Sequence, residues 1–584
     1  MHWLEAFFRM AHAGETRLAA DGFAAPSAAR RWALLIWALA VGAAAVAVCM
    51  MKFPPIWDVS GDTLALLETG WRIWHGQVPH RDFYSVIGPF PEGIFGLTFF
   101  ISQHDVAGFP KALLLTGVIL SAWSWRISRD RLSIGWRLPV ALLVLLMPMA
   151  PAYLGGGEGP PFGSGQHTTY AMIYNRLGWS ALFLQMLVML VPRRGAVTGQ
   201  GVFWEAVAGG AALALCVFCK INFLLGALAL AGYWVLLCPK PGVVRLLGLM
   251  AGLAVVAALL AAYPGGVVEY FGDQWKLLSV TRSESYLARL IVRMRANIPW
   301  VLLLPVVHGW VLSARSGQSG LREMWPWTRN FVVALGVSFF VTTFNVEGGE
   351  VPGLVIASLI TIEMALRARA EVRSDWAVRC FLVKTCGGLL VLSYLCFDAT
   401  GVAYSFLWTL RKPNWQAESE ALPGRFSVIP IPVHFNEPTG RDEVMQAIFR
   451  RRSGPWFNPG TGNYMTPRQM ARWISDGVEL LAPRVTPQDR VFVADWYNPF
   501  NIALGLKPAK GGAMLWDYGV LVDDHVHPDV QRTLEEVTIF LVPKRAHLAG
   551  QPEFMLRTYG RGLGTDFVRD SESEIWTCWR RVRH

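Results

Sequence analysis

The most constraining feature of this sequence is a series of apolar stretches, most about twenty residues long, that carry almost no charge. An α-helix rises about 1.5 Å per residue, so a stretch of this length crosses the hydrocarbon core of a bilayer. Charged residues make up only 16% of the chain, whereas about a quarter is usual in soluble domains. We therefore predict an all-α polytopic membrane body of roughly eleven transmembrane helices. The expected spans are 32–51, 108–126, 138–154, 171–191, 203–219, 221–238, 244–262, 298–314, 330–345, 352–366 and 377–397.

Arginine and lysine residues gather in the short connections between these spans. If the short apolar segment 90–103 does not cross, these basic loops fall on the same side as residues 1–31. The positive-inside rule then places that side in the cytoplasm. This arrangement indicates a bacterial inner-membrane protein with a transmembrane domain at 32–397. The segments expected in the periplasm are the loops 52–107, 155–170 and 263–297 and the separate domain 398–584.

The segment 398–584 has the pattern of a water-soluble domain. Short apolar runs at 490–495, 537–542 and 575–579 predict strands, and 467–482 predicts a helix, so the expected class is α/β or α+β. The segment carries 22 Lys and Arg against 21 Asp and Glu, so almost all of the net charge of +11 belongs to the first 397 residues. Basic loops facing anionic lipid account for that charge, and nucleic acid is not an expected partner.

The first outer loop is the densest in polar residues that follow a pattern. Asp58 precedes an amphipathic helix at 62–75, and Asp62 begins it. The apolar stripe of this segment predicts a helix lying in the membrane interface. The helix is followed by Gly76-Gln-Val-Pro-His-Arg-Asp-Phe-Tyr84 and then Gly88-Pro89. Asp62 also has a purely structural explanation, because an acidic residue in the first turn stabilises a helix.

This loop resembles the first outer loop of the GT-C superfamily of membrane glycosyltransferases, which carries an acidic residue near the membrane surface and, in many bacterial members, a Gly-x-x-Pro-x-x-Asp-Phe stretch before Gly-Pro. The resemblance implies a GT-C-like helical body and a polyprenyl-phosphate sugar donor. It also implies that Asp62 is the catalytic acidic residue, with Asp58 as the alternative. His80, Arg81 and Asp82 would bind the acceptor or support that residue. The family pattern has one acidic residue before the helix where this chain has two, so the choice between them stays open.

The chemistry of such a reaction fits a site with one carboxylate and several cations. A glycosidase needs two carboxyl groups because its leaving group must be protonated. A sugar on a lipid phosphate departs with the phosphate already ionised, so positive charge must stabilise it and one carboxylate must accept the proton of the attacking hydroxyl.

Several basic residues are candidates for binding the phosphate. Arg282, Tyr286, Arg289 and Arg293 recur on one helical stripe of the loop 263–297, which fits either a phosphate clamp or a helix touching ordinary lipid headgroups.

Two further groups of residues lie at predicted outer turns. Lys220 and Asn222 stand between two apolar runs, where the lysine must face water or a phosphate. Tyr174, Asn175 and Arg176 begin a span, and Arg176 there is either an anion contact or an interfacial anchor.

We therefore predict an inverting membrane glycosyltransferase that moves a hexose or pentose from a polyprenyl-phosphate donor to a lipid, polysaccharide or protein acceptor outside the cytoplasm. No cofactor is assigned. A divalent metal stays open, with Asn345, Glu347 and Glu350 as an acidic turn that solvated loop charge explains better. One rival is an O-antigen ligase or polymerase, although its catalytic loop is expected between late spans. Another is a glycolipid or polysaccharide transporter, which requires ionisable residues deep within spans.

Overall fold

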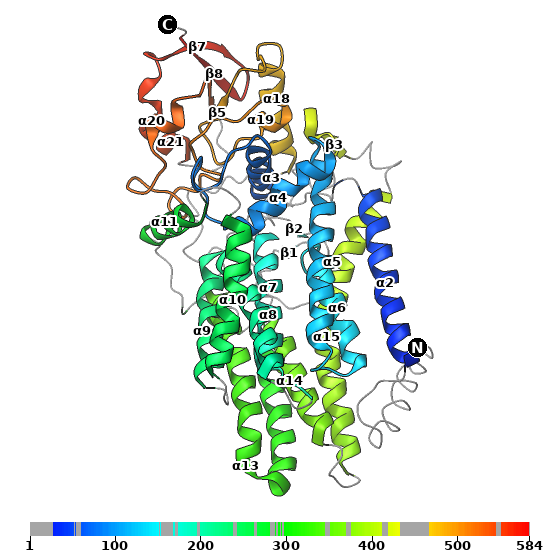
Figure 1. Cartoon of the computed structure of the whole chain (residues 1–584). Helices are drawn as coiled ribbons and strands as arrows, with labels where there is room; N and C mark the ends of the chain where they lie inside the picture. Colours follow the sequence, from blue (N-terminus) through cyan, green and yellow to red (C-terminus); the bar gives the residue numbers. More distant parts are fainter. Residues whose placement is uncertain are drawn as a thin grey trace.

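The protein is a bundle of long helices with a small sheet domain on one of its ends (Figure 1). We call the end that carries this domain the outer end, and the opposite end the inner end. The computed structural model describes residues 27–51, 53, 60–150, 152–153, 168–169, 173–194, 199–237, 242–261, 266–280, 287, 290–291, 294, 297–344, 351–368, 375–410, 419–432, 467–544 and 551–582.

Long apolar helices form the body of the bundle. Five of the described helices are long and apolar enough to cross a membrane, and three further apolar helices are shorter. Leu39, Trp204 and Leu236 are each more than 60% exposed on this surface, as lipid-facing residues are. The predicted helical membrane body is confirmed, whereas the number of eleven spans stays a prediction. The helices are α2 (Ser27–Met50), α5 (Phe109–Ser128), α6 (Ile134–Leu146), α7 (Ile173–Leu190), α8 (Gly199–Val217), α9 (Ile221–Leu236), α10 (Gly242–Ala261), α13 (Ile298–Phe344), α14 (Gly353–Ala368) and α15 (Asp375–Leu410).

Helix α13 contains two of the predicted spans, 298–314 and 330–345, and the connection between them is also helical. The helix nevertheless doubles back at the inner end (Figure 1). The rings of His308 and Phe331 stack at a centroid distance of 4.2 Å, which is feasible only if the two arms run side by side. The two spans are therefore two antiparallel arms.

Helix α15 differs from the prediction at its outer end. The last span was expected to end at 397, with the soluble domain following, but the helix continues to Leu410. Asp398 consequently lies inside a helix of the bundle and is buried, at 3% exposure. Glu363 is buried within α14 in the same way. The spans are thus less free of charge than the sequence pattern indicates.

Short helices cover the outer end of the bundle. They are α3 (Ser60–Trp74), α4 (Pro89–Ser102), the 3-10 turn η1 (Val106–Gly108) and α11 (Gly266–Ser279), beside the two-stranded pair β1 (Ala152–Tyr153) and β2 (Thr168–Thr169). Helix α4 has 14 residues and lies at this end, as expected for a segment that does not cross. Helix α3 was expected in the membrane interface with its polar face in water. Instead Glu68 and Arg72 on that face are buried beneath the sheet domain.

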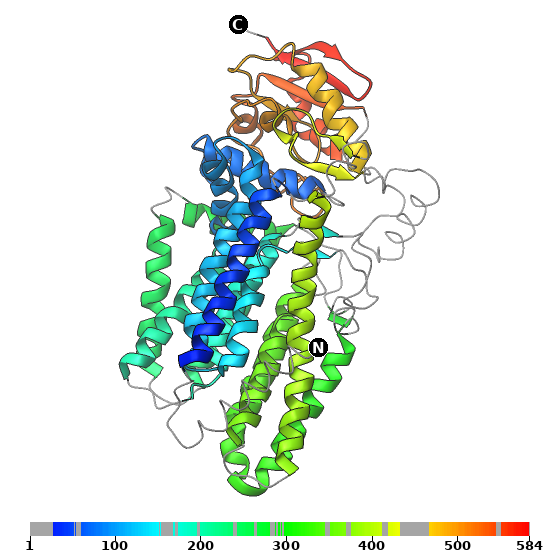
Figure 2. The same cartoon turned by 90° about the vertical axis from the view of Figure 1, so that its right-hand side faces the viewer.

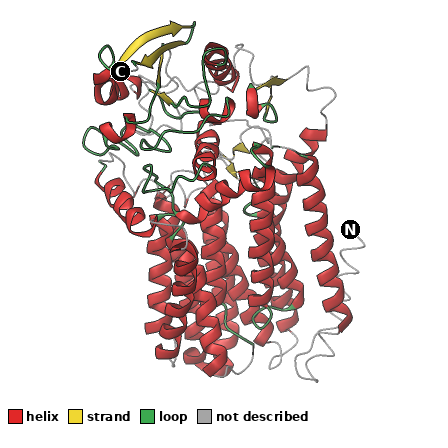
Figure 3. Cartoon of the chain, turned by 45° about the horizontal axis from the view of Figure 1, so that its top comes forward, coloured by secondary structure: helices red, strands yellow, loops and turns green. Residues whose placement is uncertain are grey.

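The sheet domain follows α15 and is a small α+β unit (Figure 3). The strands of its main sheet run in the order β5-β6-β8-β7, with β5 and β6 parallel and the other pairs antiparallel, and β3 and β4 form a separate antiparallel pair. Strands predicted at 490–495, 537–542 and 575–579 and the helix at 467–482 are confirmed. The elements are β3 (Ser419–Ala421), η4 (Gly424–Phe426), β4 (Pro430–Pro432), α18 (Pro467–Leu481), β5 (Val491–Val493), α19 (Phe500–Ala503), α20 (Val530–Leu534), β6 (Ile539–Pro543), α21 (Gln551–Tyr559), η6 (Gly560–Gly562), β7 (Phe567–Glu572) and β8 (Trp576–Arg581).

The basic connections between spans meet at the inner end. Arg194 bonds with both carboxylate oxygens of Glu363 and donates its backbone N–H to the Asp130 carbonyl. Arg367 donates to the carbonyls of Pro192 and Arg193. The α5–α6 and α7–α8 connections and the end of α14 therefore share one end of the bundle, as the charge pattern predicts.

Candidate active site

The outer end of the bundle holds most of the described residues singled out in the sequence. Asp62 lies in the first turn of α3 and is buried, at 5% exposure. Asp58 lies outside the described residues, so the choice between the two carboxylates stays open. Arg282, Arg289 and Arg293, as well as the acidic turn at 345–350, also lie outside them.

The loop 76–88 is fastened to both neighbouring parts of the protein. Tyr84 donates its backbone N–H to Gly512 in the sheet domain, at 2.9 Å. Gly88 donates to the carbonyl of Cys219 at the α8–α9 turn, at 2.8 Å. A Cβ atom at Gly88 would come within 2.1 Å of the Phe218 carbonyl oxygen, so the close approach needs a glycine. The Gly-Pro pair thus joins this loop to the turn that carries Lys220.

His80 fixes the same loop to α11 and α4. Its Nδ1 lies 3.1 Å from Asp273 on α11, and its Nε2 lies 3.5 Å from Glu92 on α4. The ring also packs edge-on against Tyr270. Burial by itself lowers the pKa of His80, but the two carboxylates outweigh it and raise that pKa to about 9. His80 is therefore a charged, fully enclosed residue that holds the loop in place, with no side-chain surface open to a substrate.

Asp82 and Arg81 hold the turn against the sheet domain. The Asp82 carboxylate accepts from the backbone N–H of Val78 at 2.8 Å and from Arg81 at 3.0 Å. Burial raises its pKa, but these hydrogen bonds outweigh burial and keep the pKa below its usual value. Arg532 from α20 approaches Asp82 at 4.0 Å and donates to the Arg81 carbonyl.

Lys220 and the start of α7 come together beneath this loop. The Lys220 Nζ lies 5.0 Å from the centroid of the Tyr174 ring, and the Cys219 thiol donates to the Tyr174 carbonyl at 3.2 Å. Asn175 is buried, and its amide oxygen and nitrogen form no hydrogen bond with any described residue. Such a buried amide requires a bound polar group or water. Asn222 is half-buried in the first turn of α9.

Arg176 pairs with a residue that sequence reasoning missed. Its guanidinium donates to Asp398 at 2.8 Å and to the Met147 carbonyl at 3.3 Å. Both side chains are almost fully buried. The prediction had taken Asp398 as the first residue of the soluble domain. A single acidic residue in the apolar run 386–403 was the signal that could have identified it.

An apolar pocket is lined in part by residues close in sequence to this ion pair. Most of its lining residues come from the region of α2, from α5 and from α15. Helices α2 and α15 are neighbours in the bundle (Figure 2). Met149, which lines it, follows Met147, whose carbonyl bonds with Arg176. Val402, which also lines it, lies one turn after Asp398 on α15. The lining residues are Val48, Met51, Pro110, Leu113, Met149 and Val402.

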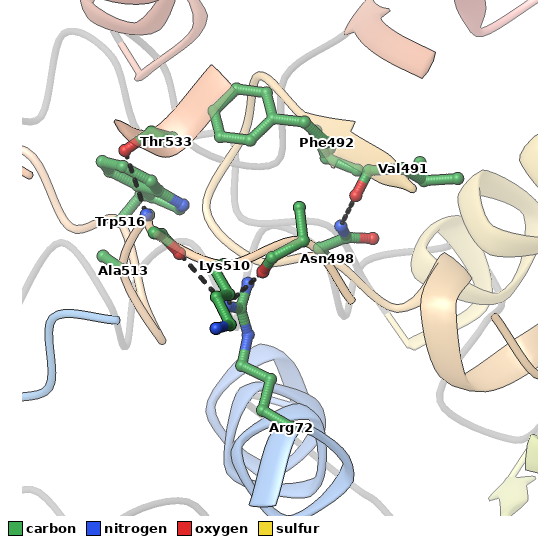
Figure 4. Close-up of a pocket in the computed structure, with 12 residues that line it drawn as sticks. Arg72, Val491, Phe492, Asn498, Lys510, Ala513, Trp516 and Thr533 are labelled. Carbon is green, nitrogen blue, oxygen red and sulfur yellow. Dashed lines mark hydrogen bonds between the residues drawn. The ribbon is translucent and has the colours of Figure 1, made fainter. Parts of the chain in front are cut away.

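A second pocket lies between α3 and the sheet domain. Arg72 points from α3 into it and donates to the carbonyls of Ala509 and Gly511, each at 3.1 Å (Figure 4). Glu68, one turn earlier, bonds with Arg72 and with the backbone N–H of Asn498. Burial raises the pKa of Glu68 to about 7, although Arg72 opposes this. These contacts dock the domain on α3.

No group of three or more His, Cys, Asp or Glu side chains that could hold a metal ion occurs among the described residues. The metal requirement therefore stays open, as in the sequence analysis.

Comparison with known proteins gives distant structural likenesses, among them two structures of one protein. No family model matches the chain, and no curated protein matches it. ArnT from Cupriavidus metallidurans bound to undecaprenyl phosphate aligns at 12% identity and a TM-score of 0.40, over 93% of this chain and 98% of ArnT. The apo state of the same protein aligns at 12% identity and a TM-score of 0.45, over 95% and 99%. At this similarity, however, the alignment assigns no activity, and we base the function on the residues of this chain.

Proposed function

We propose that this protein is a GT-C-like membrane glycosyltransferase that transfers a sugar from a polyprenyl-phosphate donor to an acceptor outside the cytoplasm. The reaction inverts the anomeric centre. Asp62 acts as the base, with Asp58 as the alternative. The outer end of the bundle would face the periplasm, where the sheet domain contacts the acceptor.

One observation carries this proposal: the start of α7 combines cationic contacts with a buried amide that has no described partner, and an apolar pocket is lined by residues close in sequence to its buried ion pair. Lys220 lies over the ring of Tyr174, and Arg176 pairs with Asp398. Asn175, between Tyr174 and Arg176 in the chain, has an amide without a hydrogen-bonding partner among the described residues. The pocket is lined by Met149 and by Val402, which lies one turn after Asp398 on α15. A lipid phosphate has the matching parts, since its chain is apolar and its headgroup is an anion with several acceptor oxygens.

The reaction needs few groups from the protein. The acceptor hydroxyl oxygen attacks the anomeric carbon while the bond from that carbon to the donor phosphate oxygen breaks. The hydroxyl proton passes to the carboxylate of Asp62, and the phosphate leaves with the bonding electron pair. Positive charge close to the leaving oxygen stabilises the transition state more than the ground state, because negative charge develops there.

Arg176 and Lys220 would stabilise the departing phosphate. Arg282, Arg289 and Arg293 join them in this proposal, since they follow α11 along the chain on the same outer loop. His80, Arg81 and Asp82 would position the loop over the acceptor. Asn222 would contribute its amide to a hydroxyl of the sugar.

The decisive experiment uses the purified protein in lipid nanodiscs with a panel of radiolabelled polyprenyl-phosphate sugars and acceptor lipids. The wild type should form a new glycosidic bond with at least one pair. The double variant Asp58→Asn and Asp62→Asn should lose about 10²–10⁴-fold in rate, because the attacking hydroxyl then lacks its base. The single variants identify which carboxylate acts.

The matched control is Asp566→Asn, which changes an exposed aspartate of the sheet domain. It should retain wild-type rates, and all variants should show the wild-type melting temperature. Full transfer by a folded double variant would exclude both aspartates as the base. Uptake of labelled glycolipid into vesicles without a new glycosidic bond would instead establish a transporter.

A further inference from the structure

A separate cluster of arginines lies at the inner end, far along the bundle from the proposed active site. Arg137 stands in the first turn of α6 and is buried, at 6% exposure. Its guanidinium lies over the ring of Trp125 on α5, 4.6 Å from the centroid. It forms no hydrogen bond with any residue in the described part of the chain, and its Nε is fully enclosed. A buried guanidinium without acceptors in the described chain takes them from outside the protein, from water or from an anion.

The surroundings of Arg137 are strongly positive. Arg30 at the start of α2, Arg129 at the end of α5 and Arg194 after α7 are close enough for their charges to act on it. Asp130 is the acidic group of the described chain that opposes them there, and it is already engaged by Arg129 at 3.8 Å and Arg193 at 3.5 Å. Glu363 neutralises Arg194. Asp130 is then left facing Arg30, Arg129 and Arg137, so positive charge is in excess.

This cluster differs from the other arginine groups of the inner end. Arg131 is paired with Glu205 and with the Val191 carbonyl. Arg194 is held by Glu363 through two hydrogen-bonding nitrogens. Those residues connect helices to one another and have their acceptors within the chain. Arg137 is as buried as these structural arginines, but it has no acceptor among the described residues.

The position of the cluster indicates what kind of anion reaches it. Trp32, directly after Arg30 and Arg31 on α2, is 63% exposed, and Leu35 one turn further along is 46% exposed. The exposed apolar side of α2 therefore begins beside the arginines. Tryptophan next to basic residues at the end of an apolar helix is typical of the level of lipid headgroups. An anion bound at this level can therefore be the headgroup of a lipid whose acyl chains lie along the exposed side of α2.

We propose that Arg137, with Arg30 and Arg129 at its rim and Trp125 beneath it, binds the phosphate of an anionic phospholipid of the inner leaflet. The phosphate oxygens accept hydrogen bonds from the Arg137 guanidinium, and the acyl chains lie against α2. The site is separate from the donor site, which the proposed reaction requires at the outer end. It would fasten α2, α5 and α6 together through a lipid molecule.

The test measures lipid binding by native mass spectrometry on the full-length protein in detergent, titrated with phosphatidylglycerol or with phosphatidylcholine of the same chains. The wild type should bind phosphatidylglycerol at least tenfold more tightly. Arg137→Gln should lower that affinity about tenfold to a hundredfold, as expected for the loss of hydrogen bonds to a charged group, and leave phosphatidylcholine binding unchanged. Arg137→Lys keeps the charge and should recover part of the affinity.

Arg472→Gln is the matched control, because it removes an exposed arginine of the sheet domain. Should Arg137→Gln fail to fold, Arg129→Gln at the exposed rim should weaken phosphatidylglycerol binding about threefold. Unchanged phosphatidylglycerol binding in a folded Arg137→Gln and in Arg129→Gln would overturn the proposal. Displacement of the lipid by millimolar inorganic phosphate would overturn the choice of a lipid over a free anion.

Discussion

The two ends of the bundle use the same interaction for different purposes. Arg194 and Glu363 form a buried pair at the inner end, and Arg176 and Asp398 form one at the outer end, each at 2.8 Å. The carboxylate of Glu363 has several partners, since it also accepts a hydrogen bond from the Ser133 backbone N–H and lies 3.8 Å from Arg367. Asp398 has a single hydrogen bond within the described chain, and Val402, one turn further along α15, lines an apolar pocket. The inner pair, with several partners, serves stability, whereas the outer pair retains room for a ligand.

The largest expected effect separates these two pairs. Asp398→Asn and Glu363→Gln should each cost about 3–5 kcal/mol, because each leaves a buried guanidinium without its counter-charge. Only Asp398→Asn should also abolish transfer, since Arg176 then loses the orientation that the phosphate requires. Melting temperature and the transfer rate per folded molecule measure the two effects. Equal loss of rate in both variants would remove the distinction between the ends.

The next effect concerns pH and belongs to the outer end alone. The pKa of His80 is raised to about 9 in the folded protein, against an ordinary value of 6.5. Its contribution is therefore complete below pH 6.5 and is lost as the pH rises toward 9. The loss amounts to about 3 kcal/mol in all. Thermal melting between pH 6 and pH 9.5 should show this decline, and His80→Gln should flatten it. His525→Gln, an exposed control, should retain the wild-type profile.

A smaller effect tests whether the loop 76–88 must lie tightly against the α8–α9 turn. Gly88→Ala places a methyl group against the Phe218 carbonyl and should cost about 1–3 kcal/mol, with reduced transfer as Lys220 shifts. Gly93→Ala on α4 is the matched control, because nothing lies within 4 Å of its Cβ position. That change should stabilise the protein by about 0.5–1 kcal/mol through the better helix-forming residue. A stable and active Gly88→Ala would show that the loop tolerates displacement.

The smallest effect is expected at the contact between Arg532 and the loop. Arg532 is 53% exposed and lies 4.0 Å from Asp82, so solvent screens the pair. Arg532→Ala should therefore change stability by less than about 1 kcal/mol. The transfer rate should change less than twofold, because the backbone bonds of Tyr84 and Gly511 still hold the domain. A large loss in both measurements would mean that the domain depends on this single side chain.

The outer loop shows where prediction from the sequence succeeds and where it ends. The density of motif residues at 76–88 predicted a site loop, and in the structure this segment contacts both the sheet domain and the α8–α9 turn. The role of each residue in this loop could not be predicted from the sequence. The protonated form of His80, for example, is stabilised by Asp273, which is distant in the sequence, and by Glu92, which no motif singles out. Helix α3 was expected in the interface because an amphipathic pattern describes one helix and cannot reveal a domain that covers its polar face.

The sequence by itself determined the membrane body, the shared end of the basic loops and the class of the C-terminal domain. These properties follow from local sums, since hydropathy over about twenty residues decides insertion and short-range alternation decides strands. Only the tertiary structure decided which charges meet. Arg176 finds Asp398 more than two hundred residues away, and Arg137 finds no acceptor among the described residues. Ion pairing depends on distances of a few ångströms between helices, and those are set by how the helices pack.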